Sequence, residues 1–345
     1  MKKIHVVACG LTLLAISGAA CAQSGVQLYG VIDEFLGTQT PVGTKHAYGL
    51  FSNGMQTSYF GIAGNEDLGG GYAAVFRLEA YLTPSSGKVG RFTGDPSFWG
   101  RNAYVGLKTP AGLVTAGRNT VPYFLDALRV NPFGNAFGFS PAMIQMYKGL
   151  PGQEITGDTE WNNSVMYTSP GLGGFELSAI YGFGNAAGRP GQNQWGGSAA
   201  YGRGPAYAVV AYQQLKYNVT PGDLATSIPG FEQQSALLAG ATWDFRVAKV
   251  YGFYQHVDDS ITTGDLSTNS GQLGVSVPFG DAGKLMASYM YMKGIGRGDP
   301  IRRTWAVGYD YRLSVRTDVY LVYTNDHATS AGAGDTAGVG IRTAF

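Results

Sequence analysis

This chain of 345 residues has little charge, almost no cysteine and few long apolar runs. Charged residues are 14% of the chain and nearly balanced, with 24 Lys+Arg against 23 Asp+Glu, so the basic surface of a nucleic-acid-binding protein is missing. The mean hydropathy of −0.04 excludes a bundle of membrane-spanning helices. Aromatic residues at 13% exclude disorder, because they carry too much apolar surface to leave in water. A single β-rich body remains, with 53 Gly and 22 Tyr.

The one long apolar stretch lies at the N-terminus and has the layout of a secretory signal peptide. Lys2 and Lys3 precede apolar residues 6–16, and the small-x-small motif at 20–22 marks a cleavage site. The stretch is too short to span a bilayer. We therefore expect residues 1–22 to be removed.

Removal of the signal peptide leaves residues 23–345 as one mature domain. Both cysteines, Cys9 and Cys21, leave with the signal peptide, so no disulfide can hold the exported protein together. The alternative is a lipoprotein leader with Cys21 as the lipidated residue. Gly18 disfavours it, because a large aliphatic residue is normally found there.

Alternation of apolar and polar residues with a period of two runs through the mature sequence and predicts β-strands. In residues 72–83, for example, Tyr72, Phe76 and Leu78 lie on one face, and Arg77 and Glu79 lie on the other. Sixteen such segments are expected, at 26–36, 57–65, 72–83, 100–109, 112–118, 162–170, 174–183, 194–202, 206–216, 235–245, 247–257, 269–277, 284–293, 303–312, 317–325 and 336–345.

Short turns and long polar loops alternate between these strands. The turns at 65–71, 109–111, 171–173, 203–205 and 279–283 are rich in Gly, Pro and Asp. A transmembrane antiparallel up-and-down β-barrel has this pattern, because its turns lie on one side of the membrane and its loops on the other. The barrel must close, since every backbone polar group in hydrocarbon needs a partner. About sixteen strands leave a water-filled lumen.

Five motifs and a terminal aromatic residue stand in order along the mature chain. They are Leu28-Tyr29-Gly30-Val31-Ile32-Asp33, Asn65-Glu66-Asp67-Leu68-Gly69-Gly70-Gly71, Arg101-Asn102-Ala103-Tyr104-Val105-Gly106-Leu107, Ala116-Gly117-Arg118, Asn162-Asn163-Ser164-Val165 and Phe345. In this order they resemble the trimeric general porins of Gram-negative outer membranes, especially the β-proteobacterial type. Phe345 is similar to the terminal aromatic by which such barrels are assembled.

The resemblance implies an outer-membrane homotrimer in which each subunit lets small hydrophilic solutes and ions diffuse passively. It also implies contacts with outer-membrane lipid, lipopolysaccharide and the barrel-assembly machinery, and no cofactor. In this family a long loop folds into the lumen and narrows it. The longest connection here, at about 119–161, follows the fifth strand and takes that place. Its prolines and phenylalanines favour a fixed, packed path.

Charged side chains at the constriction would set the selectivity of such a channel. The resemblance places Arg101 and Arg118 in a basic wall facing the loop. Strand parity turns Arg77 and Glu79 inward, and Arg77 is expected to belong to the same wall. Arg101 is expected to share its face with Ala103 and Val105. The alternative is that each arginine is neutralised by a neighbour, such as Arg77 by Glu79. Other lumen-facing residues are Asp33 and Tyr59; Glu34 has outward parity, so it must lie near the rim, at a subunit interface or beside a bulge.

The loop offers few acids to oppose the basic wall. Its first half has only one acid, and the other three stand at its far end. The candidate loop residues at the constriction are Asp126, Asn131, Phe133, Asn135, Glu154, Asp158 and Glu160. A net-positive, partly aromatic constriction is expected from this set, and with it a mild preference for anions or for solutes with a ring.

Chemistry of other kinds has little support in the sequence. The mature histidines His46, His256 and His327 are far apart, and no spacing suggests zinc. Residues 274–278 end in proline and do not form a nucleophile elbow. Calcium at Asp258-Asp259 is left open. Three alternatives also stay open: a substrate-specific channel for aromatic or organic acids, an outer-membrane hydrolase, and a soluble exported adhesin.

Overall fold

The computed structural model describes residues 25–90, 97–148, 156–184, 193–216, 230–296, 298, 300–329 and 331–345. The expected signal peptide and Glu154 lie outside these residues. Within them, no helix is long and apolar enough to cross a membrane.

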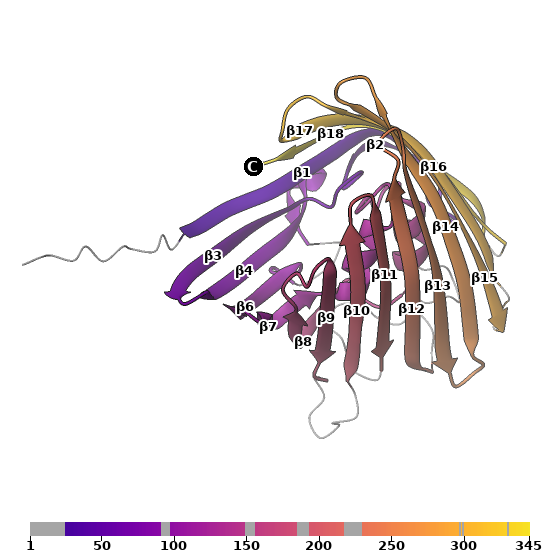
Figure 1. Cartoon of the computed structure of the whole chain (residues 1–345). Coiled ribbons are helices and arrows are strands. Elements are labelled where there is room, and N and C mark those ends of the chain that lie inside the picture. The colour runs from indigo at the N-terminus through magenta and orange to yellow at the C-terminus, as the bar shows by residue number, and fades with distance from the viewer. Residues whose placement is uncertain are drawn as a thin grey trace, which may run out of the picture.

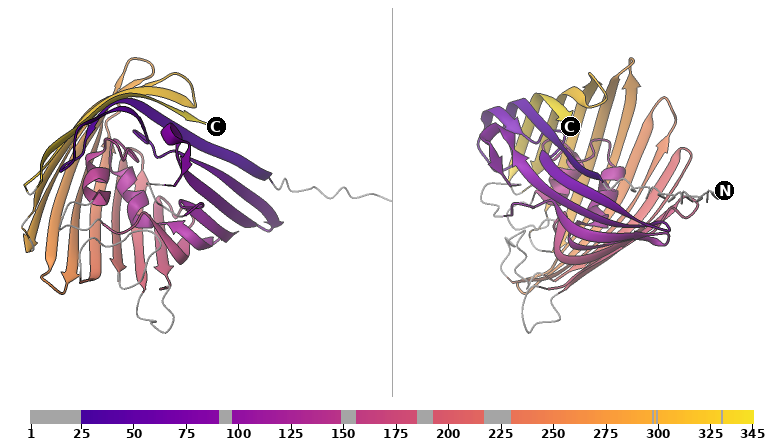
Figure 2. Two further views of the ribbon diagram at one scale, coloured as in Figure 1. Left: turned by 180° about the vertical axis from the view of Figure 1, so that it is seen from behind. Right: turned by 90° about the vertical axis from the view of Figure 1, so that its left-hand side faces the viewer.

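Long antiparallel strands form the wall of the molecule and two short helices lie inside it (Figures 1 and 2). The strands are β1 (Gly25–Thr40), β2 (Ala47–Ser52), β3 (Tyr59–Gly69), β4 (Tyr72–Thr83), β5 (Lys88–Val89), β6 (Asn102–Thr109), β7 (Gly112–Thr120), β8 (Glu160–Thr168), β9 (Phe175–Gly182), β10 (Gln194–Arg203), β11 (Ala206–Leu215), β12 (Phe231–Asp244), β13 (Lys249–Ile261), β14 (Leu266–Phe279), β15 (Gly283–Gly296), β16 (Ile301–Arg312), β17 (Thr317–Ala328) and β18 (Gly332–Ala344). The helices are η1 (Pro84–Ser86), α1 (Pro122–Arg129) and α2 (Pro141–Tyr147).

The sheet closes on itself because β1 pairs with β18 along one side and with β3 and β2 along the other. β2 and β3 pair with successive parts of β1 and together take one place in the wall, and β5 pairs only with β4. The described chain therefore forms a closed barrel of sixteen antiparallel strands. The predicted strand number and closure are confirmed.

Tight turns join the strands at one end of the barrel, and glycines make these turns possible. Gly69, Gly70 and Gly71 all have positive φ angles, of 80°, 61° and 83°, in the left-handed region that side chains disfavour. The Asp67 carboxylate also accepts a hydrogen bond from the Gly69 N–H at 2.8 Å. The motif that was predicted as the first tight turn therefore folds as one.

The two faces of the sheet differ as expected for a barrel in a membrane, with large apolar residues exposed on the outside. The parity predicted for the strand after Arg101 is wrong, however. Val105 lies opposite Phe76 and is 63% exposed, so it faces outward with Ala103, whereas Tyr104 lies opposite Arg77 on the inner face. Arg101 precedes β6 in a bend, so its side chain can turn inward in spite of its position.

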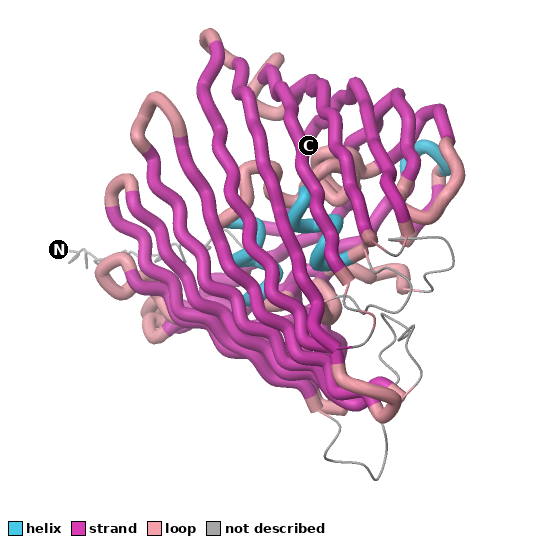
Figure 3. Tube along the Cα trace, turned by 90° about the vertical axis from the view of Figure 1, so that its right-hand side faces the viewer, coloured by secondary structure: helices cyan, strands magenta, loops and turns pink. Residues whose placement is uncertain are grey.

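The segment between β7 and β8 enters the barrel and packs against the inner wall (Figure 3). Helices α1 and α2 begin with Pro122 and Pro141, which suit the first turn of a helix because their missing N–H groups would lack partners there. The Ser140 side chain caps α2 by accepting a hydrogen bond from the Met143 N–H. The fixed, packed path predicted for this loop is present, although its two helices were not predicted.

Two apolar clusters hold this loop, residues 121–148, against the wall. In the larger cluster, Phe124 and Met143 of the loop pack with inward residues of β9 to β13 and β15, such as Leu238 and Met290. In the smaller, Phe139 packs on Phe35 of β1, with ring centroids 4.9 Å apart. Polar bonds add to these contacts, because the Gln145 side chain donates to the Met290 carbonyl and to Thr304.

Candidate functional site

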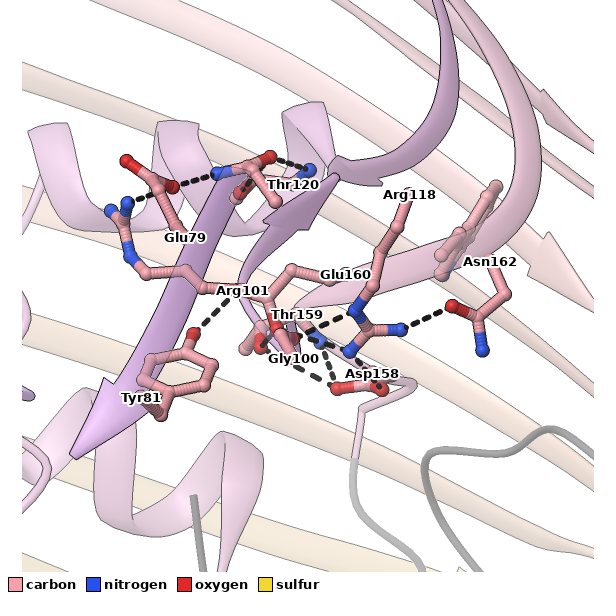
Figure 4. A network of polar contacts seen from close by, with 12 residues as sticks. Glu79, Tyr81, Gly100, Arg101, Arg118, Thr120, Asp158, Thr159, Glu160 and Asn162 are labelled. Atoms are coloured by element: carbon pink, nitrogen blue, oxygen red, sulfur yellow. Dashed lines mark hydrogen bonds and ion pairs between the residues drawn. The ribbon is translucent and has the colours of Figure 1, made fainter. Parts of the chain in front are cut away.

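Arg118 contacts both ends of the segment between β7 and β8, which we call the lumenal loop (Figure 4). This residue lies near the end of β7, and its guanidinium lies 3.7 Å from the carboxylates of both Asp158 and Glu160. It also donates hydrogen bonds to the Gly100 carbonyl at 2.7 Å and to Asn162 at 2.8 Å. With only 7% of its surface exposed, Arg118 ties the loop ends together.

Arg101 belongs to a second network on the neighbouring strands, centred on the buried carboxylate of Glu79 (Figure 4). The Arg101 guanidinium forms an ion pair with Glu79, and the Asn102 amide donates to the same carboxylate oxygen. The Tyr29 hydroxyl donates to the other oxygen at 2.6 Å. Arg101 also lies 4.1 Å from the centroid of the Tyr59 ring. Arg101 is therefore a neutralised arginine, stacked on an aromatic ring.

Arg77 has different surroundings, although it follows the same inward face of β4. Its side chain is exposed, and among the described residues it forms no hydrogen bond or ion pair. Its guanidinium lies 5.9 Å from the centroid of the Tyr104 ring. The predicted alternative, in which Glu79 neutralises Arg77, is wrong, because Glu79 pairs with Arg101 instead.

Because Gly61 has no side chain, the Tyr29 ring can lie over β3 on the inner face and reach Glu79. Gly61 lies between them, opposite Tyr29 on β1 and opposite Glu79 on β4. A Cβ atom at Gly61 would lie 2.8 Å from Glu79 and 3.0 Å from the Tyr29 ring. The Tyr59 ring meets the Tyr29 ring edge-on, with centroids 6.1 Å apart. Tyr59 and Glu79 thus lie on the inner face that was predicted for them.

On the loop side, Asp126 is buried in α1 and faces the wall of the barrel. It accepts a hydrogen bond from the Tyr207 hydroxyl at 3.2 Å and pairs with Arg129 at 3.3 Å. Arg129 reaches on to Glu176 of β9 at 2.8 Å. Burial raises the pKa of the Asp126 carboxyl above its ordinary value, because the charged form loses its water there.

The next three loop candidates contribute to the packing of the loop. Asn131 is 3% exposed and donates to the Gly134 carbonyl and to Ser140 within the loop. Phe133, also 3% exposed, packs in the smaller cluster. Asn135 is half-buried. The side chains of Asn131 and Phe133 are therefore almost inaccessible to a solute in the lumen.

Asp33 is inward, as predicted, and it is completely buried. Its carboxylate holds the backbone of the chain between β2 and β3, because the N–H groups of Gly54, Met55 and Gln56 all donate to it within 3.1 Å. The Tyr320 hydroxyl of β17 adds a fourth bond at 2.6 Å. The sequence offered no signal for these partners.

The outward residue Glu34 lies beside η1. Ser52 and the Ser85 N–H both donate to one of its carboxylate oxygens, the latter at 3.0 Å. The neighbouring outward residues Leu36 and Leu50 are 67% and 57% exposed.

Phe345 completes the seam of the barrel. Its backbone exchanges two hydrogen bonds with Gly30 of β1, and the edge of its ring lies over that glycine. The assembly role of Phe345 stays a prediction.

No group of three or more metal-ligating side chains occurs in the part of the chain that the structure covers. The Asp258 carboxylate, considered for calcium, accepts a hydrogen bond from Ser267 and pairs with His256.

A closed barrel with an apolar outer face, a charged inner wall and a packed loop in its lumen is a channel of the outer-membrane type. The chain belongs to the Gram-negative porin family, whose model matches residues 8–331. It is thus an outer-membrane porin through which small hydrophilic solutes diffuse passively.

Two relatives and two solved structures illustrate the similarity. Outer membrane porin protein 32 of Delftia acidovorans is 33% identical, covering 90% of this chain and 86% of the relative. An outer membrane porin protein of Bordetella pertussis is 29% identical over the full length of both. The anion-selective porin from Comamonas acidovorans has a TM-score of 0.77 at 27% identity, covering 94% and 100% of the two chains. OmpT of Vibrio cholerae in its trimer form shares the fold, with a TM-score of 0.69 at 15% identity and coverage of 93% and 99%.

Proposed function

We propose that this porin prefers anions and that Arg77 is the main source of the preference. The observation that carries the proposal is the contrast between Arg77, in the middle of β4, and most other arginines of the lumen. Arg101, Arg118, Arg302 and Arg342, and Arg129 of α1, each lie within 4 Å of at least one carboxylate. Arg312 also has inward parity and no carboxylate within 4 Å among the described residues, but it is the last residue of β16, at the turn end of the barrel. Arg77 has no such carboxylate among the described residues, so its charge acts on solutes without local compensation.

The similar porin from Comamonas acidovorans is anion-selective, which supports the same preference. Arg101 and Arg118 belong to the proposed basic wall with Arg77, but their fields are reduced by their carboxylate partners. On the loop side, Asp158 and Glu160 compensate Arg118 at the proposed constriction, and the buried residues from Asp126 to Asn135 contribute by fixing the position of the loop.

Reversal potentials in planar bilayers under a potassium chloride gradient test the proposal. Arg77→Ser should shift the reversal potential towards cations, because it removes the uncompensated charge. Arg303→Ser is the matched control: it removes the same charge from an exposed arginine on the outer face of β16. Equal shifts in the two variants, or no shift for Arg77→Ser, would contradict the assignment.

We also propose that the segment at about 119–161 narrows the channel. Its helices and apolar clusters occupy part of the lumen, which supports this role. Excision of residues 131–148 should raise single-channel conductance, with folding checked by the heat-dependent band shift of the barrel. An unchanged conductance in a folded variant would contradict the role.

We infer that the mature chain is residues 23–345 and that it assembles as a homotrimer. A solved structure of this fold is described as a trimer, and Glu34 gives further support, because a carboxylate facing outward suits a protein contact better than lipid. Analytical ultracentrifugation in detergent should give three subunits per particle, and a monomer would contradict the proposal. Contacts with lipid, lipopolysaccharide and the assembly machinery stay predictions.

We further infer that the protein is not an enzyme. Among the described residues, one group contains the three side-chain types of a catalytic triad, and it places Asp258 between Ser267 and His256. In a triad the histidine must stand between the other two, because it takes the proton from the serine. Release of p-nitrophenol from short-chain esters by the folded protein, lost in Ser267→Ala, would overturn this inference.

A further inference from the structure

The uncompensated charge of Arg77 lies in a wall of tyrosines, and this combination points to a particular kind of solute. Tyr104 is directly opposite Arg77 on β6, and its ring lies under the guanidinium. On the other side, the Tyr29 ring extends across β3 to the Glu79 carboxylate, one inward position further along β4. Aromatic rings therefore flank Arg77, an inward arginine that, among the described residues, has no carboxylate within reach.

The wall between the rings is low, because the residues of β3 at this level are small. Ala63 lies opposite Arg77, and Gly61 lies opposite Glu79. The Tyr29 ring and the Glu79 side chain already cover Gly61, so the place for a planar solute is over Ala63, beside the Arg77 guanidinium.

Charge and shape together define the solute. A guanidinium binds a carboxylate through two parallel hydrogen bonds, and an aromatic ring packs edge-on or offset on tyrosine rings. Arg77 is the one described arginine at this place in the wall that has no carboxylate partner. It can therefore pair with one carboxylate of a solute, and a second carboxylate on the same solute would have no cationic partner. An aliphatic acid could make the ion pair but would lack the ring contacts.

We propose that Arg77, Tyr104 and Tyr29 form a weak binding site for aromatic monocarboxylates on the wall of the channel. Such solutes would bind transiently and concentrate in the lumen, and their flux would saturate. This inference rests on the proposed function, because the solute must reach Arg77 through the lumen as an anion.

The test uses the mature protein in planar bilayers and measures inhibition of the chloride current. The probes are benzoate and its non-aromatic counterpart cyclohexanecarboxylate, at a pH where both are ionised. Benzoate should inhibit with a half-saturating concentration about five-fold lower than that of cyclohexanecarboxylate, as expected for one or two ring contacts. Equal concentrations for the two acids, or no saturation by benzoate, would overturn the proposal.

Variants separate the contributions of the charge and the rings. Arg77→Gln should abolish saturation by both acids, whereas Tyr104→Leu should remove only the preference for benzoate. Tyr289→Leu is the matched control, because Tyr289 is exposed on the outer face of β15. A benzoate preference that survives in Tyr104→Leu and in the Tyr29→Leu, Tyr104→Leu double variant would overturn the site.

The two proposals can fail separately. A cation-preferring parent channel would contradict the proposed function. An anion-preferring parent that does not distinguish the two acids would leave the proposed function standing and contradict only this inference.

Discussion

The Tyr320 hydroxyl donates a 2.6 Å hydrogen bond to the Asp33 carboxylate, although 287 positions separate the two residues in the sequence. Tyr320 lies on β17 and Asp33 on β1, two strands apart around the barrel and separated by β18. The bond therefore crosses the seam at which the first and last strands close the sheet. Asp33 also holds three backbone N–H groups of the chain after β2, so one carboxylate stabilises both the seam and this connection.

Asp33→Ala should destabilise the barrel strongly, because three buried N–H groups lose their acceptor. We expect the free energy of unfolding to fall by about 3 kcal/mol, since each unsatisfied buried donor is costly. Urea unfolding in lipid vesicles measures this. Tyr320→Phe is the matched control and should cost about 1 kcal/mol, because it removes only one of the four bonds. Equal losses in both variants would mean that the backbone contacts of Asp33 contribute nothing.

Arg118→Gln should loosen the lumenal loop without opening the barrel. The substitution removes the charge that Asp158 and Glu160 share, and both ends of the loop depend on it. We expect noisier open-channel current in single-channel records, and an intermediate effect for Arg118→Lys, which keeps the charge but not the planar fork. Current noise equal to that of the parent would show that the apolar clusters alone fix the loop.

Asp126→Asn should change how stability depends on pH. Because burial raises the pKa of Asp126, the folded chain binds this proton more tightly than the unfolded chain. Asp126 therefore contributes stability below the ordinary aspartate pKa, and this contribution is lost as pH rises through the raised pKa. Arg129, Tyr207, Ser198 and Glu176 face the group.

Unfolding free energies at pH 4 and pH 8 check this expectation. Relative to the parent, Asp126→Asn should be more stable at pH 8 than at pH 4, because asparagine has no proton to lose. A difference between variant and parent that is constant with pH would contradict it.

Gly30→Ala should disturb the seam beneath Phe345. A Cβ atom there would lie 2.5 Å from the Tyr59 carbonyl oxygen and 2.6 Å from the Phe345 ring. We expect a loss of about 1–3 kcal/mol, as for other overpacked sites, and a lower yield of folded barrel. Gly49→Ala is the control, because nothing lies within 4 Å of the added carbon on β2. A folded yield equal to that of Gly49→Ala would contradict this view.

The strands could be predicted because a period of two is a local property of the sequence. Residues 72–83, for example, were expected as a strand and form β4 with the same bounds. β2 was not predicted, because residues 47–52 pair with β1 only after a turn that carries no clear signal. Counting alternate residues from an inward Arg101 placed Ala103 and Val105 on the inner face. They face outward, because Arg101 lies in a bend before the strand begins.

The site was harder to predict, because alternation shows which residues share a face but not what covers that face. Leu238 and Met290 point inward yet are fully buried, since the loop lies on them. Likewise, the partners of Arg118 lie some forty positions away along the chain, and no spacing links them. Only the folded arrangement shows that Arg77, among the described residues, lacks the carboxylate partner that Arg101, Arg118, Arg302 and Arg342 have.

The burial of Phe139 and Met143 between the lumenal loop and the wall has a consequence for how the molecule sieves solutes. Given the proposed role of this loop in narrowing the channel, the largest solute admitted is set when the protein folds, because the loop is packed into an apolar interior. A substitution that weakens the packing between the loop and the wall should widen the channel while the barrel stays folded. The permeability of the channel would then change in variants whose thermal unfolding is still the same as that of the parent.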